Sequence, residues 1–216
     1  MATLVFDIET VGVQSVADVG GEEVGGLSPF TGKIITIGIW DLERSQGAAY
    51  FETTAETEAW QEGDWWFRPS TERDMLEDFW EGARSYDIFV TFAGRTFDAP
   101  FLNLRSAAHD ISPTKELLEH RYLSRQKTMH HVDLQDQLSF YGAFGKRPSL
   151  HACCELFGIE SSKADGVSGK DVADLFGHEK FRDIAYYNAR DVTATTELYK
   201  KWYQHLAPMS FKNVEH

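Results

Sequence analysis

Short runs rich in apolar and β-branched residues predict four strands along the chain. They cover residues 3–6 (TLVF), 33–41 (KIITIGIWD), 47–53 (GAAYFET) and 87–94 (DIFVTFAG). Because only a short turn separates the second run from the third, we expect these two strands to pair in antiparallel fashion.

Between and after these strands, apolar residues recur at helical spacing. The first such segment, residues 70–85, opens with a cap signal, because Thr71 is followed three residues later by Asp74. Further helices are predicted after Pro100 within FDAPFLNLRSAAH, within HHVDLQDQLSFYG and SLHACCELFGI, and over residues 178–206 with a break near the start.

The order of these elements is typical of an α/β protein, because three strands are followed by a helix, a strand and then mostly helices. Residues 12–32 and 161–170 are rich in glycine and polar residues and are predicted to be loops, whereas residues 54–69 receive no assignment. We therefore expect a single domain over residues 1–216, with a mixed central sheet of about five strands flanked by helices.

Composition narrows the class of protein. Acids outnumber Lys and Arg by 34 to 21, and the resulting net charge of −13 argues against non-specific binding of a nucleic acid backbone over a broad surface. The sequence contains no apolar run of membrane-spanning length and no signal-peptide pattern at its start. Cys153 and Cys154 are adjacent on a predicted helix, so we expect packed thiols and a reducing, cytoplasmic location.

Acidic residues follow the predicted strands in two places and occur on a helix in a third. Asp7 and Glu9 come at the end of the first strand, where residues two apart face the same side and repel each other. Asp98 follows the fourth strand near a helix start, and Tyr187 and Asp191 are four residues apart on one helix face. Four acids from three distant segments could therefore meet over the sheet.

Carboxylates that meet cannot all remain ionised unless cations neutralise them. A cluster of oxygen ligands suits Mg²⁺ or Mn²⁺, and no set of His and Cys at zinc-ligand spacing is present. Two such ions about 4 Å apart are the arrangement for in-line displacement at phosphorus. Tyr187 would hold or deprotonate the attacking water.

Structural interpretations compete with this chemistry. A solvated strand end would account for the first acid pair taken alone, and helix capping would account for Asp98. Asp133 and Asp136 form a rival pair three residues apart, which we interpret as capping or solvated acids. Tyr186 is the expected packing residue beside Tyr187.

Three motifs in order, FDIET, FDAPFL and YNARD, resemble those of the DEDD exonucleases, and the tyrosine four residues before the last acid resembles their DEDDy subgroup. Over roughly residues 3–205 the chain is more closely similar to stand-alone exonucleases related to the proofreading domain of family B DNA polymerases. The resemblance implies a ribonuclease H-like fold and release of nucleoside 5′-monophosphates from a 3′ end.

The same resemblance implies a role for each motif residue. Asp7, Glu9 and Asp191 would bind the metal ion that carries the nucleophile, and Asp7 would bridge to a second ion. Asp98 would support the second ion through water, and Tyr187 would position the attacking water. The implied cofactor is therefore a pair of Mg²⁺ or Mn²⁺ ions.

One position departs from the family pattern. Relatives often carry Asn in F-N-G-x-x-F-D, whereas this chain reads FAGRTFD and places Ala93 there. Because that Asn is thought to touch substrate, its absence puts substrate binding or specificity in question. Arg95 is a candidate to replace the missing contact. The candidate substrate contacts are Thr10, Arg95, Phe97, Lys146 and Arg147. For the aromatic residues Phe30, Trp65 and Trp66, in segments that we interpret as irregular, burial is expected and base stacking is the alternative.

We expect a metal-dependent 3′-5′ exonuclease that acts on single-stranded nucleic acid or frayed 3′ ends, with DNA favoured over RNA. One alternative is a 3′-5′ exoribonuclease that resembles ribonuclease D or an oligoribonuclease. An alternative of another class is a nucleic-acid-binding module that has lost catalysis. A polymerase or repair partner would act in trans, and no membrane partner is expected.

Overall fold

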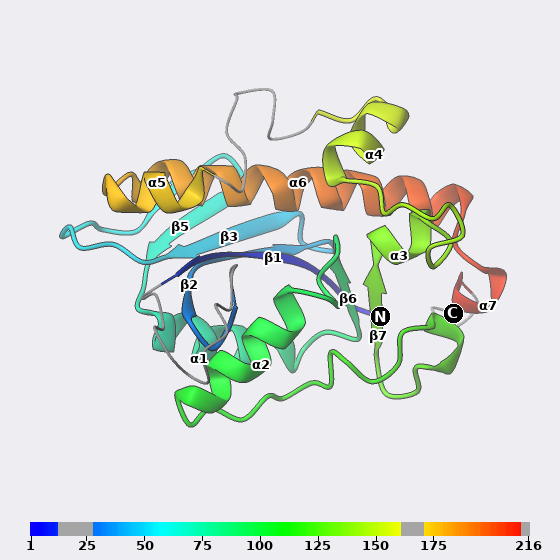
Figure 1. Ribbon diagram of the computed structural model, residues 1–216, viewed down its shortest axis with the longest axis horizontal. Coiled ribbons are helices and arrows are strands. Elements are labelled where there is room, and N and C mark those ends of the chain that lie inside the picture. The colour runs from blue at the N-terminus through cyan, green and yellow to red at the C-terminus, as the bar shows by residue number, and fades with distance from the viewer. Residues whose placement is uncertain (13–27, 161–170, 213–216) are drawn as a thin grey trace, which may run out of the picture.

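The computed structural model describes residues 1–12, 28–160 and 171–212, so the predicted loop at 161–170 and most of that at 12–32 lie outside the described residues. A seven-stranded mixed sheet forms the centre of the fold (Figure 1). In spatial order its strands are β4 (Trp60–Glu62), β5 (Trp65–Pro69), β3 (Gln46–Phe51), β2 (Gly32–Asp41), β1 (Thr3–Gly12), β6 (Ile88–Thr91) and β7 (His130–Asp133).

The strand directions confirm a mixed sheet. β1, β6 and β7 run parallel, whereas β2 runs antiparallel to both β1 and β3, as the short turn before β3 predicts. Parallel strands carry their carboxyl ends to one edge of the sheet, so the residues that follow β6 and β7 come close together there.

The expected number of about five strands was too low, because the unassigned residues 54–69 contribute β4 and β5. These two strands pair with each other, and β5 also pairs in parallel with β3. The interpretation of Trp65 and Trp66 as lying in an irregular segment was therefore wrong. The two side chains point to opposite faces of β5, as alternation along a strand requires.

The prediction of one helix over HHVDLQDQLSFYG was wrong at its start. His130–Asp133 pairs with β6 as β7, and only Leu134–Leu138 forms a helix, α3. A four-residue strand gains its stability from the neighbouring strand, which a local pattern does not reveal.

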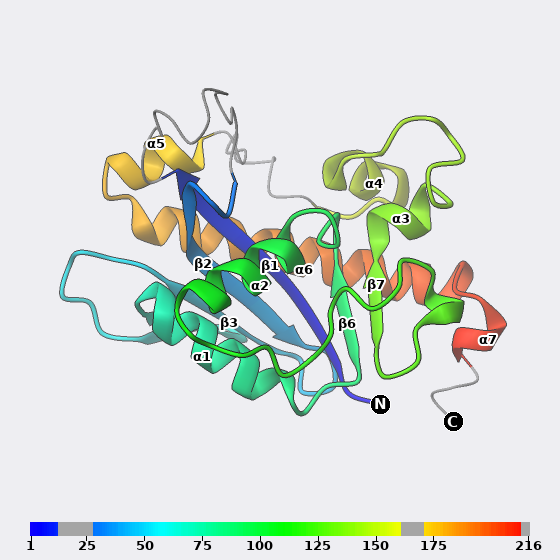
Figure 2. The same cartoon turned by 60° about the horizontal axis from the view of Figure 1, so that its bottom comes forward.

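Helices cover both faces of the sheet (Figures 1 and 2). On one face the long helix α6 crosses β1, β2 and β3, with α5 beside it, and α3 and α4 contact α6 toward β7. On the other face lie α1 and α2. The bounds are α1 (Glu72–Ala83), α2 (Asp98–Ala108), α4 (Leu150–Phe157), α5 (Val172–Gly177), α6 (Phe181–His205) and α7 (Met209–Lys212), with a short 3-10 helix at Leu123–Arg125.

Helix starts follow the sequence signals. Thr71 caps α1 by accepting a hydrogen bond from the Asp74 backbone N–H, as predicted. α2 begins at Asp98, three residues earlier than predicted, because Pro100 in a first turn lacks only an N–H that has no helical partner. Cys153 and Cys154 are buried in α4, which confirms the packing interpretation. Among the described residues, no helix combines the length and apolar character needed to cross a membrane.

A partly buried ion pair fixes α2, and with it Asp98, against the sheet. Glu72 in α1 accepts a hydrogen bond from the Ile34 N–H of β2 at 2.8 Å and two from Arg105 of α2 at 2.8 and 2.7 Å. Although burial opposes it, the hydrogen bonds from Arg105 and His109 lower the pKa of Glu72. The carboxylate therefore stays charged and joins three elements.

Candidate metal centre

Strand β1 presents two acids to α6. Asp7 pairs with Gly38 of β2 and Glu9 with Thr36, and the register of the two strands shifts directly after Glu9. Because the pleat alternates, Asp7 and Glu9 face the same side of the sheet, as predicted from their spacing. A bulge of this kind increases local twist and re-aims side chains, and such bulges are common beside functional sites.

Helix α6 supplies the third acid. One carboxylate oxygen from each of Asp7, Glu9 and Asp191 lies within 4.8 Å of the other two. Tyr187 precedes Asp191 by one helical turn and is buried. The spacing of four residues therefore places both side chains on the face of α6 that lies over β1.

The fourth acid, Asp98, joins the cluster from the first residue of α2. Its Oδ1 accepts a hydrogen bond of 3.1 Å from the backbone N–H of Ile8, which lies between the two acids of β1. Asp98 is buried, and its charge acts on both Asp7 and Glu9. The structure thus brings all four predicted acids together, three of them within 4.8 Å and the fourth beside them.

Burial and mutual repulsion raise the pKa values of the acids in this cluster. Burial, and then the charge of Asp98, raises the pKa of Asp7 well above its usual range. Burial, and then the charge of Asp191, does the same for Glu9. Burial raises the pKa of Asp98 to about 7, although the Ile8 N–H opposes the change. Without a cation, ionising this cluster is therefore costly.

The donor set fits Mg²⁺ or Mn²⁺. All the converging side chains offer carboxylate oxygens, the ligands that these hard cations prefer, and none offers sulfur or imidazole nitrogen. A divalent ion would neutralise the repulsion that raises the pKa values. Among the described residues, this is the one group of three or more His, Cys, Asp or Glu side chains with metal-binding geometry.

Sequence reasoning missed Asn188, which touches the cluster directly. Its Nδ2 donates a 2.9 Å hydrogen bond to Oδ2 of Asp7 and lowers the pKa of that acid. The available signal was an Asn between Tyr187 and Asp191 in a helix interior, where Asn is a poor helix former.

The loop that joins β6 to α2 is anchored by Asp133. Its carboxylate accepts hydrogen bonds of 3.0 Å from the backbone N–H groups of both Ala93 and Arg95 and also caps α3. This confirms the capping interpretation of Asp133, whereas Asp136 is not solvated but buried against Arg121. Ala93 has a φ of 63°, a left-handed conformation that is strained for a residue with a Cβ.

The candidate substrate contacts Arg95, Thr10 and Phe97 differ in whether their side chains already have a partner in the structure. Arg95 donates from Nη1 to the Leu117 carbonyl at 3.0 Å, so its guanidinium is already engaged. Thr10 is buried directly after the bulge, and its hydroxyl has no hydrogen-bond partner among the described residues. Phe97 is half-buried and packs on Phe101, with ring centroids 5.1 Å apart.

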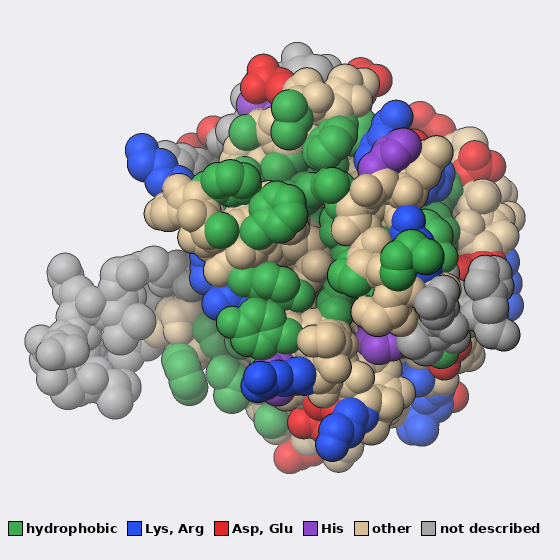
Figure 3. Space-filling view, turned by 90° about the vertical axis from the view of Figure 1, so that its right-hand side faces the viewer, with side chains coloured by type: hydrophobic (Ala, Val, Ile, Leu, Met, Phe, Trp, Pro, Cys, Tyr) green, Lys and Arg blue, Asp and Glu red, His purple; other side chains and the backbone are tan. Residues whose placement is uncertain are grey.

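Lys146 and Arg147 lie toward the C-terminal end of α6. Both line an apolar cavity of about 630 Å³ together with His205 at the end of α6, fourteen residues beyond Asp191. At 1.5 Å per residue this corresponds to about 20 Å along the helix. Figure 3 shows apolar side chains that gather on this end of the molecule. The exposed Phe140, Phe144, Leu156 and Leu206 also line the cavity.

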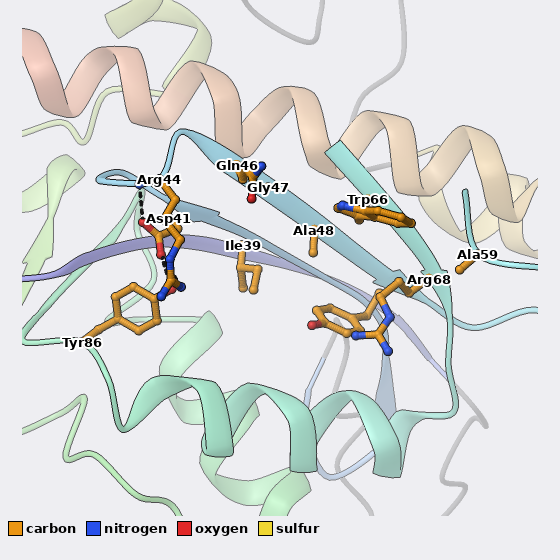
Figure 4. Close-up of a pocket in the computed structure, with 11 residues that line it drawn as sticks. Ile39, Asp41, Arg44, Gln46, Gly47, Ala48, Ala59, Trp66, Arg68 and Tyr86 are labelled. Carbon is orange, nitrogen blue, oxygen red and sulfur yellow. Dashed lines mark hydrogen bonds and ion pairs between the residues drawn. The ribbon is translucent and has the colours of Figure 1, made fainter. Parts of the chain in front are cut away.

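A second cavity, of about 540 Å³, lies on the face of the sheet opposite α6 (Figure 4). There Asp41 pairs with Arg44 and accepts a hydrogen bond from the Tyr86 hydroxyl, and Arg68 lies over the ring of Tyr50. Trp66 borders it and is 44% exposed. The expected burial of Trp66 was thus wrong, as it was for the exposed Phe30, whereas Trp65 is half-buried against Trp40.

Comparisons with known proteins address the family and the fold. Residues 67–215 match a family model described as a predicted 3′-5′ exonuclease related to the exonuclease domain of PolB. This matched region contains Asp98, Tyr187 and Asp191 and begins after the two acids of β1, which the structure places in the same cluster. No curated protein matches the chain.

Among solved structures, the family B DNA polymerase from the hyperthermophilic archaeon Pyrobaculum calidifontis is similar, with a TM-score of 0.63 and 17% sequence identity. The match covers 94% of this chain and 24% of the polymerase, so the chain spans about a quarter of that protein. At this identity the likeness shows the fold alone, and it agrees with the predicted ribonuclease H-like class.

Proposed function

Because the chain belongs to the family of predicted 3′-5′ exonucleases related to the exonuclease domain of PolB, we propose that it is an active, metal-dependent enzyme. Its substrate is single-stranded nucleic acid or a frayed 3′ end, with DNA favoured over RNA. It releases nucleoside 5′-monophosphates one at a time. The observation that carries the proposal is the convergence of Asp7, Glu9 and Asp191 within 4.8 Å, with Asp98 beside them.

The acids divide the binding of two ions between them. Asp7, Glu9 and Asp191 would hold one ion, Asp7 would bridge to the second, and Asp98 would hold the second through water. Bound Mg²⁺ or Mn²⁺ would supply charge neutralisation at the phosphodiester and a lowered pKa for the attacking water. Because Glu9 and Asp98 are buried and Asp7 and Asp191 are half-buried, electrostatic interactions in the cluster are stronger than at an exposed surface.

Tyr187 acts as a hydrogen-bond donor in this proposal. Burial, and then the charge of Asp191, raises the pKa of Tyr187, so its phenol keeps its proton at neutral pH. A protonated phenol one helical turn from Asp191 orients the attacking water or a phosphate oxygen rather than removing a proton.

The test compares the wild type with Asp191→Asn on 5′-labelled single-stranded DNA and RNA of one sequence, in Mg²⁺, Mn²⁺ or EDTA. We expect a ladder that shortens from the 3′ end, abolished by EDTA and by the substitution. Asp78→Asn is the matched control, because Asp78 is exposed on α1 and its loss changes the net charge equally. The relative rates on the two strands decide whether DNA or RNA is preferred.

Ala93 favours a second candidate, a module that binds nucleic acid without cleaving it. It stands where the related motif carries a substrate-touching Asn. Intact strands in both metals, together with tight binding of the strand, would replace the exonuclease proposal by this one.

A further inference from the structure

Asn188 makes a polar contact with the acid cluster from inside α6. The side chain is completely buried, and its Nδ2 donates to Oδ2 of Asp7 across 181 residues of sequence. Asp7 is the acid that the proposed function gives to both ions. Anchoring one of its two oxygens restricts the rotation of the whole carboxylate.

The fold keeps a space for this amide. Gly38 of β2 is the register partner of Asp7. A Cβ at Gly38 would lie 2.0 Å from Oδ1 of Asn188, far inside contact distance. Only a residue without a side chain therefore lets the amide lie against the sheet and reach Asp7.

The local structure gains little from this arrangement. Oδ1 of Asn188 is buried and has no hydrogen-bond partner among the described residues. A buried polar atom without a partner destabilises the folded state, and Asn lowers helix stability relative to Leu or Ala. An apolar residue at this position would thus make α6 more stable, so the contact with Asp7 is what the amide contributes.

We propose that Asn188 is a positioning residue, seated by Gly38, that holds the Asp7 carboxylate in the orientation in which it receives the metal ions. The inference rests on the proposed function, since it concerns the same cluster. Groups that orient metal ligands typically contribute 10- to 100-fold to metal affinity. We expect a loss of that size when the amide is removed.

The test measures Mn²⁺ binding to the nucleic-acid-free protein from the electron paramagnetic resonance signal of unbound Mn²⁺. Asn188→Leu removes the amide at similar volume, and Gly38→Ala leaves the amide but fills its space. Thr196→Val is the matched control, because Thr196 is also buried in α6 and, among the described residues, its hydroxyl bonds only the Val192 carbonyl of its own helix.

We expect Asn188→Leu and Gly38→Ala each to weaken Mn²⁺ binding at least tenfold, and the double variant to be no worse than the poorer single variant. Asn188→Leu should unfold in EDTA at the same or a higher urea concentration than the wild type, and excess Mn²⁺ should restore part of its strand-shortening rate. Thr196→Val should bind Mn²⁺ normally.

Mn²⁺ affinity of Asn188→Leu within twofold of the wild type would overturn the inference, even if the variant were slow. If that variant did not fold, the affinity of Gly38→Ala would decide in the same way. If Asn188→Leu binds Mn²⁺ normally and the wild type shortens the strand in Mn²⁺, the inference fails but the proposed function stands. A wild type that neither binds Mn²⁺ nor shortens the strand overturns both.

Discussion

Replacing Asp98 by Asn should make the metal-free protein more stable while it weakens the metal centre. The substitution keeps an oxygen that can accept the Ile8 N–H, so α2 remains attached to β1. It removes a carboxyl whose pKa burial raises from 3.8 to about 7. The folded state therefore prefers the protonated form, and ionisation at high pH destabilises it.

The size of the effect follows from this change in pKa. A raised pKa contributes stability that is fully present below the unfolded value and is lost as pH rises toward 7. For Asp98 the loss reaches roughly 4 kcal/mol at pH 8, and at pH 5 it is less than half of that because the folded state is still protonated. Asp98→Asn should recover this loss, so its gain in stability should be at least twice as large at pH 8 as at pH 5.

The assay is urea unfolding in EDTA at pH 5 and pH 8, followed by circular dichroism. With a slope of about 2–3 kcal/mol per molar urea, the gain at pH 8 moves the midpoint by about 1–2 M. Asp78→Asn controls for the change in net charge. In Mn²⁺ the wild type should recover more stability than the variant, because it binds the ion more tightly.

A variant no more stable than the wild type at pH 8 would refute this reasoning. So would a gain of equal size at both pH values, because the effect would then not come from ionisation of Asp98.

Three further predictions concern catalysis, substrate grip and stability. Tyr187→Phe should lower kcat by about 10- to 100-fold without changing Mn²⁺ binding, since it removes a hydrogen-bond donor and no metal ligand. Single-turnover rates and Mn²⁺ titration measure the two effects, and weaker Mn²⁺ binding would contradict the assigned role. Ala93→Asn should raise the free energy of unfolding by about 0.5–1 kcal/mol, because Asn tolerates the φ of 63°. It should also lower KM at unchanged Mn²⁺ affinity, and an unchanged KM would show that the position does not touch substrate. Arg105→Met should cost roughly 2–3 kcal/mol by leaving Glu72 buried without its main partner. Because pairing lowers the pKa of Glu72, the wild type should lose this advantage as pH falls toward 4, and equal differences at pH 4 and pH 7 in urea unfolding would argue against the ion pair.

Local spacing in the sequence was enough to find the acids. Residues two apart on a strand face the same side, which places Asp7 and Glu9 together. Residues four apart on a helix lie one above the other, which does the same for Tyr187 and Asp191. The cap at Thr71 is also a matter of neighbouring residues. These relations depend on backbone geometry alone, so they hold before the chain has folded around them.

The predictions that failed concern groups far apart in sequence. The strand β7 exists because β6 lies beside it, and the β4–β5 hairpin is held at the edge by β3. Lys146 and Arg147, which we predicted as substrate contacts, border the same apolar cavity as His205, fourteen residues beyond Asp191 on α6. Pairing partners and distances of this kind are set by the packing of whole elements.

Residue type and spacing within one element are local properties, so the sequence alone was enough to select the candidate metal-binding acids. How those acids are held depends on contacts between separate elements. The Ile8 N–H fixes Asp98 across 90 residues, and Asn188 reaches Asp7 because Gly38 leaves room for its amide. Such contacts require separate elements to approach within hydrogen-bond distance, and burial then raises the pKa of the acids that they bring together.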